Sequence, residues 1–393
     1  MSRLGLALGL LALLSAGSAE GGRERPDRLF GRVVQALATE HCDAEFRQYV
    51  LPGLAEDHAA RDAEARTAAQ QRESVRRFLS LIPHSHLMLC SRTAWQRMEA
   101  DVVGDAYPMF GMMLEQRDGR WFAAAVLDGG PAAQEGIRTG DEVLTVDGAS
   151  PGNSTVVDWP VQDAAMGGRT LHGLLVPEAG YLAFRIRARS AGGAFLYPQE
   201  TITVAAGEYS LQDASEASIR VEEVGGRKVL YVHLWMVVHM HSAQLLAEAL
   251  ARHPQAEGLV LDLRGAGGSA AECARILQVI ELSVQATGMP LVAVVDGDTR
   301  SAKEILAHEI QRRKLGRLVG RRTAGALLAA SFVPVGPEEM LMVPHARLGA
   351  LSAAIEGKGV RPDVELRWDR ATGGLDLPRV ESLREVVRLL EKR

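Results

Sequence analysis

The stretch of residues 290–310, PLVAVVDGDTRSAKEILAHEI, constrains the fold of this chain most strongly. Residues 291–295 are an apolar, valine-rich run that enters the turn sequence Asp-Gly-Asp, which predicts a buried strand followed by a tight loop. A helix is predicted to begin near Ser301, because Ile305, Leu306 and Ile310 share one helical face. Ser301 is therefore expected at the start of a helix that packs against its own strand.

Ser301 has two interpretations at this position. The first N–H groups of a helix lack partners, so the N–H of Ala302 would stabilise an oxyanion formed beside a nucleophilic Ser301. Serine is also a preferred helix cap, and taken alone the residue fits that structural role better. The choice depends on which other groups the fold brings to this place.

The residues before this stretch alternate between strand and helix patterns. Strands are predicted at 228–236 and 258–263, and helices at 242–252 and 269–282. Repeated βα units predict a mostly parallel sheet whose faces are covered. The sequence therefore predicts an α/β core in the C-terminal half of the chain.

A glycine-rich turn follows the strand at 258–263. Gly265, Gly267 and Gly268 lie at the carboxyl end of that strand, where parallel sheets usually build sites. Glycine lets backbone N–H groups approach a reacting oxygen closely. Gly265, Gly267 and Ala270 also fit a loose dinucleotide-binding fingerprint, but this match is weak, because no acidic residue follows at the right distance and no P-loop lysine is present.

Composition and the N-terminus limit the class of protein. The chain has 393 residues, 47% of them apolar, and its net charge of −5 gives no reason to expect a nucleic-acid partner. Residues 1–19 combine Arg3, an apolar run at 4–14 and a Gly-Ser-Ala end, which predicts a secretory signal more than a retained membrane anchor. No later segment is long and apolar enough to span a membrane, so we expect a secreted or periplasmic protein without a stable membrane span.

The three cysteines bear on that compartment. In an oxidising environment they allow one disulfide and one free thiol, and Cys42 with Cys90 is the pair we would guess. Three unpaired, buried thiols are the alternative.

Residues 20–104 form a predominantly helical region. Apolar residues recur at helical spacing in two stripes, Phe30-Val33-Val34-Leu37 and Val75-Phe78-Leu79-Ile82. The sequence His84-Ser85-His86 follows the second stripe directly. A metal site would need a third ligand near this histidine pair, and nothing in the sequence places His239 and His241 beside it, so no metal is expected.

Residues 105–206 have the pattern of a separate module. Five glycines between positions 129 and 148 are spaced as turns between short apolar strands, and residues 131–135 suffice for a one-turn helix. This stretch resembles a PDZ domain, a fold that binds a chain terminus as an added strand. The resemblance implies that the loop Phe110-Gly111-Met112-Met113 holds a peptide carboxylate. Residues 149–169, rich in Gly, Ser and Pro, are interpreted as an inserted linker.

The order of these motifs resembles one family over nearly all of the chain after residue 80. The helical region, the PDZ-like module, LVLDLRGAGG, DTRSAKEI, LVGRRTAGA and IEGKGVRPDVEL are similar to the C-terminal-processing (tail-specific) serine peptidases and their tricorn-core relatives. This implies a ClpP/crotonase-like peptidase core at 207–393. It also implies that Ser301 is the nucleophile and that Ala302 with Gly267 or Gly268 forms the oxyanion hole.

One departure selects the tricorn-like branch. The processing peptidases pair the serine with a lysine, and this chain has Ala326 where that lysine belongs. Lys303 is a poor substitute, because two residues along a helix turn its side chain about 200° away from Ser301. The tricorn-like branch instead uses a Ser-His pair and a late glutamate, which implies that His86 is the general base and that Ser85 and Glu356 orient it.

These assignments imply an exported serine endopeptidase that forms an acyl-enzyme on a polypeptide substrate and requires no cofactor. The alternative is a peptidase-fold protein that has lost catalysis and binds polypeptide C-termini through the PDZ-like module. The missing lysine is the main support for that alternative.

Overall fold

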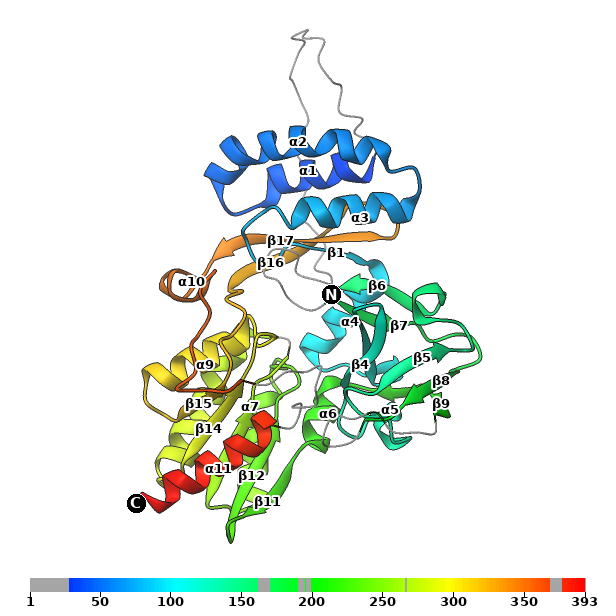
Figure 1. The fold of residues 1–393 in the computed structure, drawn as a ribbon. Helices are drawn as coiled ribbons and strands as arrows, with labels where there is room; N and C mark the ends of the chain where they lie inside the picture. Colours follow the sequence, from blue (N-terminus) through cyan, green and yellow to red (C-terminus); the bar gives the residue numbers. More distant parts are fainter. Residues whose placement is uncertain are drawn as a thin grey trace, which may run out of the picture.

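A computed structural model describes residues 28–161, 170–189, 195, 199–265, 267–367 and 377–392 of the chain. The expected signal segment, residues 1–19, lies outside the described residues. Figure 1 shows a layer of helices at one end, a β-rich module at one side and an α/β core at the other. Among the described residues, no helix is long and apolar enough to cross a membrane.

The α/β core is built on a six-stranded sheet. Its strands lie in the order β11 (Arg220–Val224), β12 (Arg227–His233), β13 (Gly258–Asp262), β14 (Leu291–Val295), β15 (Arg317–Gly320) and β18 (Val364–Glu365). All neighbours from β12 onward are parallel, and β11 pairs antiparallel at the edge. The predicted α/β class and parallel sheet are therefore confirmed.

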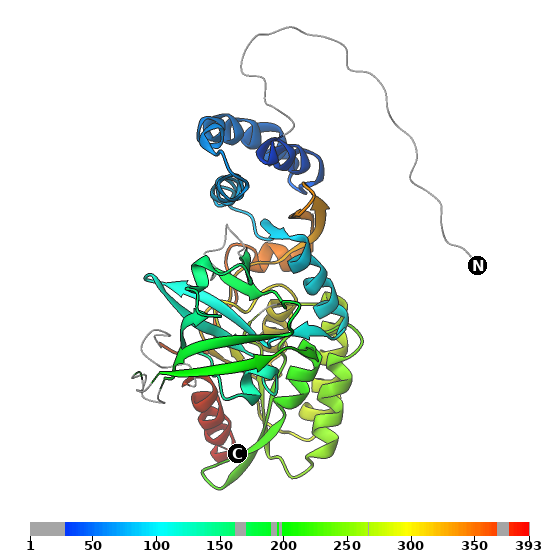
Figure 2. The same ribbon diagram turned by 90° about the vertical axis from the view of Figure 1, so that its right-hand side faces the viewer.

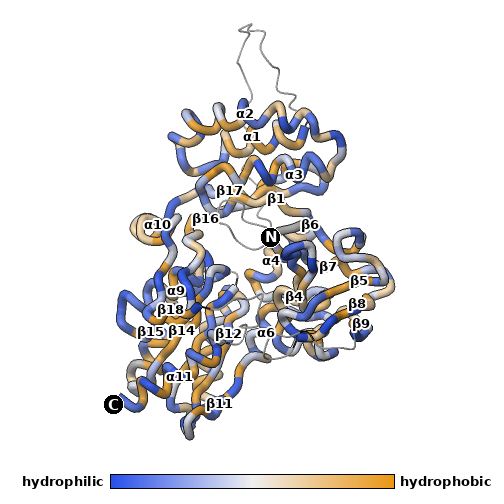
Figure 3. Tube along the Cα trace, viewed as in Figure 1, coloured by the Kyte–Doolittle hydropathy of each residue, from blue (hydrophilic) through white to orange (hydrophobic). Residues whose placement is uncertain are grey.

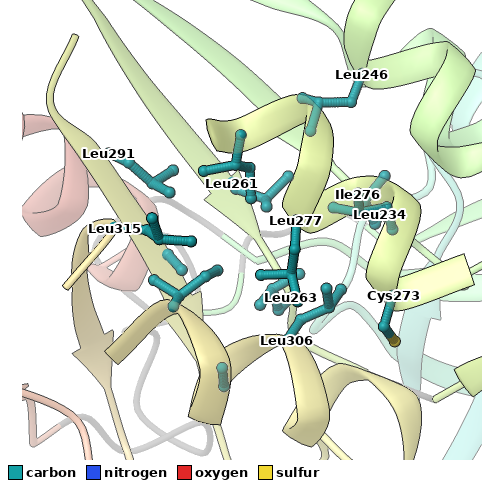
Figure 4. Packing of buried hydrophobic residues seen from close by; sticks show 14 of the residues in the cluster. Leu234, Leu246, Leu261, Leu263, Cys273, Ile276, Leu277, Leu291, Leu306 and Leu315 are labelled. Atoms are coloured by element: carbon teal, nitrogen blue, oxygen red, sulfur yellow. The ribbon is translucent and has the colours of Figure 1, made fainter. Parts of the chain in front are cut away.

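Helices cover both faces of this sheet. They are α7 (Ser242–Arg252), α8 (Ala270–Val279) with a π-helical extension (Ile280–Gln285), α9 (Ala302–Arg312) and α11 (Leu377–Glu391). Leu261 of β13 packs with residues of α7, α8 and α9 (Figure 4), whereas Val260 points to the other face, where Leu383 of α11 lies. Successive residues of a strand thus pack into two separate hydrophobic cores, as expected for a sheet that is buried on both faces.

The β-rich module contains a seven-stranded antiparallel sheet. The strands lie in the order β6 (Val157–Val161), β7 (Leu171–Leu174), β3 (Met112–Arg117), β4 (Arg120–Val126), β5 (Glu142–Val146), β8 (Tyr181–Arg187) and β9 (Glu200–Ala205). The predicted one-turn helix is α5 (Pro131–Gln134). The interpretation of residues 149–169 as a linker was wrong in part, because β6 lies within it and pairs with β7, while residues 162–169 are outside the described residues.

The N-terminal helices pack on strands from the far end of the chain. They are α1 (Leu29–Glu40), a π-helix (Phe46–Val50), α2 (Leu51–Glu64) and α3 (Ala68–Leu79). The predicted apolar stripes meet in one cluster that also contains Leu341 and Val343. Those two residues belong to β17 (Glu339–Arg347), which lies between β1 (Met88–Ser91) and β16 (Leu328–Pro334) in a three-stranded antiparallel sheet. In Figure 3 the apolar positions of these helices lie mainly on their inner sides.

Shorter elements complete the fold. They are α4 (Arg92–Val103), the pair β2 (Tyr107–Met109) and β10 (Gly207–Tyr209), α6 (Leu211–Ala217), a 3₁₀ turn (Pro151–Asn153) and α10 (Ala350–Ile355). The turned view in Figure 2 shows α4 running from the three-stranded sheet toward the core. Strands β16 and β17 leave the α/β core and form a sheet with β1, so the segment before β1 lies close to the core.

The guessed disulfide between Cys42 and Cys90 is wrong, since all three cysteines are free. Cys90 of β1 lies opposite Met340 in the strand register, and the N–H of Cys42 bonds to the carbonyl oxygen of Pro344. Each cysteine is therefore located by its neighbour on β17, Met340 or Pro344. These two positions are four residues apart along one strand, about 13 Å, which is well beyond the Cα separation that a disulfide spans.

Candidate active site

Ser301 occupies the turn between β14 and α9 in a strained backbone conformation. Its φ of 53° and ψ of −125° lie where non-glycine residues are rarely found. Its side chain makes no capping hydrogen bond to α9, so the helix-cap interpretation is not supported. Strain of this kind persists only where the surroundings enforce it. Here a fully buried strand and the buried first turns of α9 flank the residue.

The glycine loop approaches Ser301 at Gly267. A β-carbon on Gly267 would lie 2.5 Å from the β-carbon of Ser301 and 2.9 Å from the carbonyl oxygen of Arg300, so only glycine fits. Gly268 instead rests on Val237, whose N–H bonds to the carbonyl oxygen of Gly267 at 3.0 Å. Of the two glycines expected at the oxyanion hole, Gly267 contacts Ser301 and Gly268 contacts Val237.

Glu356, Ser85 and His86, which we call the relay, form a chain of hydrogen bonds. The hydroxyl of Ser85 donates to Oε2 of Glu356 at 2.9 Å and lies 2.8 Å from Nδ1 of His86. The hydroxyl has one hydrogen, and the carboxylate can only accept it. His86 must therefore carry its hydrogen on Nδ1 to bond Ser85, which makes Nε2 the unprotonated nitrogen.

One peptide group joins the relay to Ser301. The carbonyl oxygen of Ala326 accepts from the N–H of Ser301 at 2.9 Å, and the N–H of Leu327 donates to Oε2 of Glu356 at 2.6 Å. The C=O and N–H of one peptide bond thus point to the two halves of the site. The methyl group of Ala326 is buried, and no lysine amine reaches Ser301 from this position.

Two interlocked loops hold this peptide group and Glu356 in place. A β-carbon on Gly359 would lie 2.4 Å from the carbonyl oxygen of Thr323, which requires glycine in the Glu356 loop. The N–H of Gly357 donates to the carbonyl oxygen of Gly325 at 2.8 Å. Glu304 of α9 then accepts from the N–H groups of Gly325 and Ala326, both at 2.7 Å. Sequence reasoning missed Glu304, although a charged residue in the first turn of a buried helix is a signal.

Burial sets the protonation state of His86. It lowers the pKa of His86 to about 3, and the nearby Arg300 adds to the effect by repelling a protonated ring. The imidazole is therefore neutral at neutral pH, as a general base must be before it accepts a proton.

Lys303 makes hydrogen bonds away from Ser301, as its helical position predicts. Its ammonium donates to the carbonyl oxygens of Arg264 at 2.8 Å and Trp235 at 3.1 Å. Burial lowers its pKa to about 7, although Asp262 and Asp296 partly offset this. These bonds to two carbonyls leave Lys303 poorly placed to act as the base.

A cavity of about 1790 Å³ connects the site to the β module. Ser301, His86 and Gly267 line it, and so do all four residues expected to bind a peptide terminus. Of these, Phe110 and Gly111 precede β3, but Met112 and Met113 already belong to that strand. Because β7 pairs with β3 only at Leu114 and Glu115, the Met112 end of β3 has β4 as its one paired neighbour among the described strands.

The two histidine pairs named in the sequence have different partners. His84 lies beside His41, with ring centroids 4.8 Å apart, and 3.7 Å from Asp43. His239 bonds to Ser269 on the α/β core. Within the described ranges no group of three or more His, Cys, Asp or Glu residues is arranged to hold a metal ion.

Comparison with known proteins identifies similar chains. Residues 277–366 match the model of peptidase family S41. The protein named tricorn protease homolog 2 of Streptomyces coelicolor is 26% identical over 283 residues, which is 65% of this chain but only 23% of that relative. The chloroplastic C-terminal processing peptidase of Tetradesmus obliquus is 26% identical over 370 residues, covering 86% of this chain and 76% of the relative.

Among solved structures, the photosystem II D1 C-terminal processing protease superposes with a TM-score of 0.48 at 19% identity. That match covers 86% of this chain and 92% of the other.

Proposed function

We propose that this chain is a member of peptidase family S41, whose model matches residues 277–366, and that it is an exported serine endopeptidase that cleaves polypeptides through an acyl-enzyme on Ser301. The bridge from Glu356 through Ser85 to His86 supports this assignment most strongly, because it fixes the tautomer that a general base needs. Export rests on the signal-like residues 1–19.

Acylation would proceed through the groups that face the cavity. His86 Nε2 takes the hydroxyl proton as Ser301 Oγ attacks the scissile carbonyl carbon. The former carbonyl oxygen, now negatively charged, accepts hydrogen bonds from the N–H groups of Gly267 and Ala302. The C–N bond then breaks, and the amine leaves with the proton from His86. A water molecule, deprotonated by the same nitrogen, then attacks the ester carbonyl carbon. The C–O bond to Ser301 breaks, His86 gives the proton to Ser301 Oγ, and the carboxylic acid product leaves.

Glu356 and Ser85 act through His86 rather than on the substrate. When the ring becomes positively charged, the carboxylate at the end of the chain stabilises that charge through the Ser85 hydroxyl. Polypeptide enters by way of the common cavity, and we assign Phe110, Gly111, Met112 and Met113 to binding of a chain terminus. Because these residues and Ser301 open on one cavity, one substrate chain is expected to contact both.

The test is hydrolysis of an unfolded polypeptide by wild type, Ser301→Ala and His86→Ala, each with its folded fraction measured by circular dichroism. We expect losses of about 10⁴-fold or more in both variants, since nucleophile and base act as a unit. His345→Ala is the matched control, because His345 is exposed on β17. Hydrolysis by folded Ser301→Ala at the wild-type rate would disprove the nucleophile assignment.

The non-catalytic alternative has a distinct outcome in the same experiment. A folded wild-type chain that binds C-terminal peptides tightly and cleaves none of them would be a binding protein. Chelators are expected to leave hydrolysis unchanged, because no step above passes through a metal.

A further inference from the structure

Lys303 is a buried cation that the mechanism above does not use. It is the second residue of α9, two positions after Ser301, and its side chain is fully inaccessible to solvent. Its described hydrogen bonds go to carbonyl oxygens rather than to carboxylates. Burying an ammonium group costs free energy, so its presence beside the nucleophile calls for a physical explanation.

The two carbonyl groups belong to the parts that carry the oxyanion donor. Arg264 begins the glycine loop, which the structure describes at residues 264, 265, 267 and 268, and Gly267 of this loop touches Ser301. Trp235 begins the segment 235–237, on which that loop rests. Val237 binds the loop on both sides, through the carbonyl oxygen of Gly267 at 3.0 Å and the N–H of Ser269 at 2.8 Å.

We propose that Lys303 is a positioning residue for the oxyanion hole, because it ties the glycine loop and its supporting segment to the helix that carries Ser301. This inference rests on the proposed function of Ser301. One side chain bonds both carbonyls, so the distance between Gly267 and Ser301 depends on a cross-link that starts on the nucleophile's own helix.

Neighbouring groups explain why a lysine is tolerated there. Asp262 at the end of β13 and Asp296 at the end of β14 stabilise the ammonium, while burial and Arg264 oppose it. His233 of β12 shares the carbonyl oxygen of Arg264, 3.3 Å from its Nε2. Even after losing its proton, an amine keeps two N–H donors for the two carbonyls.

The effect on catalysis follows from geometry. An oxyanion donor stabilises the transition state only when it is held within a fraction of an ångström of the developing charge. A looser glycine loop therefore lowers kcat, whereas KM depends on contacts elsewhere in the cavity. A lysine needed only for folding would leave kcat per folded molecule unchanged.

The experiment compares Lys303→Met with Lys314→Met, which removes the same charge from an exposed position just after α9. Kinetics are corrected for active sites by titration with a fluorophosphonate. Hydrogen exchange of the loop amides, residues 264–269, is measured by mass spectrometry without substrate. We expect kcat to fall about tenfold or more with KM within about twofold, and the loop amides to exchange faster, in Lys303→Met alone.

Unchanged kcat, or a lower kcat without faster exchange of the loop, would overturn the proposal. If Lys303→Met does not fold, Lys303→Gln is judged by the same two readouts, because its amide nitrogen lies one bond nearer to the backbone and is not expected to bond both carbonyl oxygens. Hydrogen exchange is measured without substrate, so the peptidase assignment and the positioning role of Lys303 can fail independently. Faster loop exchange with no hydrolysis by wild type would remove the peptidase assignment alone, and normal hydrolysis with unchanged exchange would remove the role of Lys303 alone.

Discussion

The two halves of the candidate site are built in opposite ways. The nucleophile half, Ser301 with Gly267, lies on turns at the ends of adjacent buried strands, β14 and β13. The relay half joins Ser85 and His86, which precede β1, to Glu356, which follows α10 and lies 271 positions from Ser85. Local strand and helix preferences therefore shape the first half, whereas the second exists only when distant segments assemble.

This difference indicates how substitutions in each half should affect the protein. Strain at Ser301 is carried by a sheet covered on both faces, so changes in the nucleophile half should act on chemistry without unfolding the core. The relay depends on a few hydrogen bonds between loops, and one peptide group, Ala326–Leu327, links it to Ser301. We therefore expect substitutions in the relay to affect activity in proportion to the bonds they break.

Glu356→Gln should give the largest effect of those that probe the relay. Glu356 accepts three hydrogen bonds, from the N–H of Ser85 at Oε1 and from the Ser85 hydroxyl and the N–H of Leu327 at Oε2. Glutamine replaces one of these oxygens by a nitrogen that cannot accept, so at least one of the three bonds is lost together with the negative charge. By comparison with the acidic member of other triads, a loss of about 10²–10⁴-fold in kcat is expected. Steady-state kinetics beside Glu223→Gln, an exposed glutamate of β11, provide the check. A loss no greater than in that control would exclude Glu356 from the relay.

Ser85→Ala should lose less activity than Glu356→Gln. It removes the bridging hydroxyl but leaves the carboxylate bonded to the N–H groups of residues 85 and 327. We expect kcat to fall about 10–100-fold, because the His86 tautomer is no longer enforced while the base itself remains. If the Ser85→Ala loss equalled that of His86→Ala, Ser85 would have a more direct part in the reaction.

The acid limb of the rate profile tests His86 in the intact site. Burial and Arg300 lower the pKa of His86 to about 3, so the ring stays neutral well below its ordinary value of 6.5. The kcat/KM of free enzyme should therefore hold as pH falls to about 5 and decline only below that, within the range where the fold survives. A half-maximal point between pH 6 and 7 would contradict the burial of this ring.

The smallest expected effect is on stability and separates Lys303 from the relay. The pKa of Lys303 is lowered from 10.5 to about 7 in the folded chain, so between these values the unfolded state binds more protons. Its contribution to the free energy of unfolding should therefore rise with pH from about 7 to about 10.5. Urea unfolding at pH 7 and pH 9 should show this gain in wild type relative to Lys303→Met, and a pH-independent difference would argue against a buried, titrating amine.

The contrast between the two halves of the site explains which of their features the sequence predicts. The strand at 291–295 matches the structure to the residue, because its apolar run and flanking turn are local signals. Ser85, His86 and Glu356 could be named only from the family resemblance, since nothing local indicates that residues 85 and 356 meet. The peptide group of Ala326 was missed because backbone hydrogen bonds leave no pattern in side chains. Glu304 left one signal, its charge in the first turn of a buried helix, but its backbone partners at Gly325 and Ala326 left none. The role of His86 as general base stays a prediction.

The most direct measurement of the central claim is the rate at which a fluorophosphonate modifies the folded chain, followed by mapping of the adduct by mass spectrometry. The account predicts a single adduct on Ser301, formed about 10³-fold faster in wild type than in His86→Ala, because the base activates the hydroxyl. Equal rates in the two proteins, or no adduct on Ser301 in folded wild type, would contradict it.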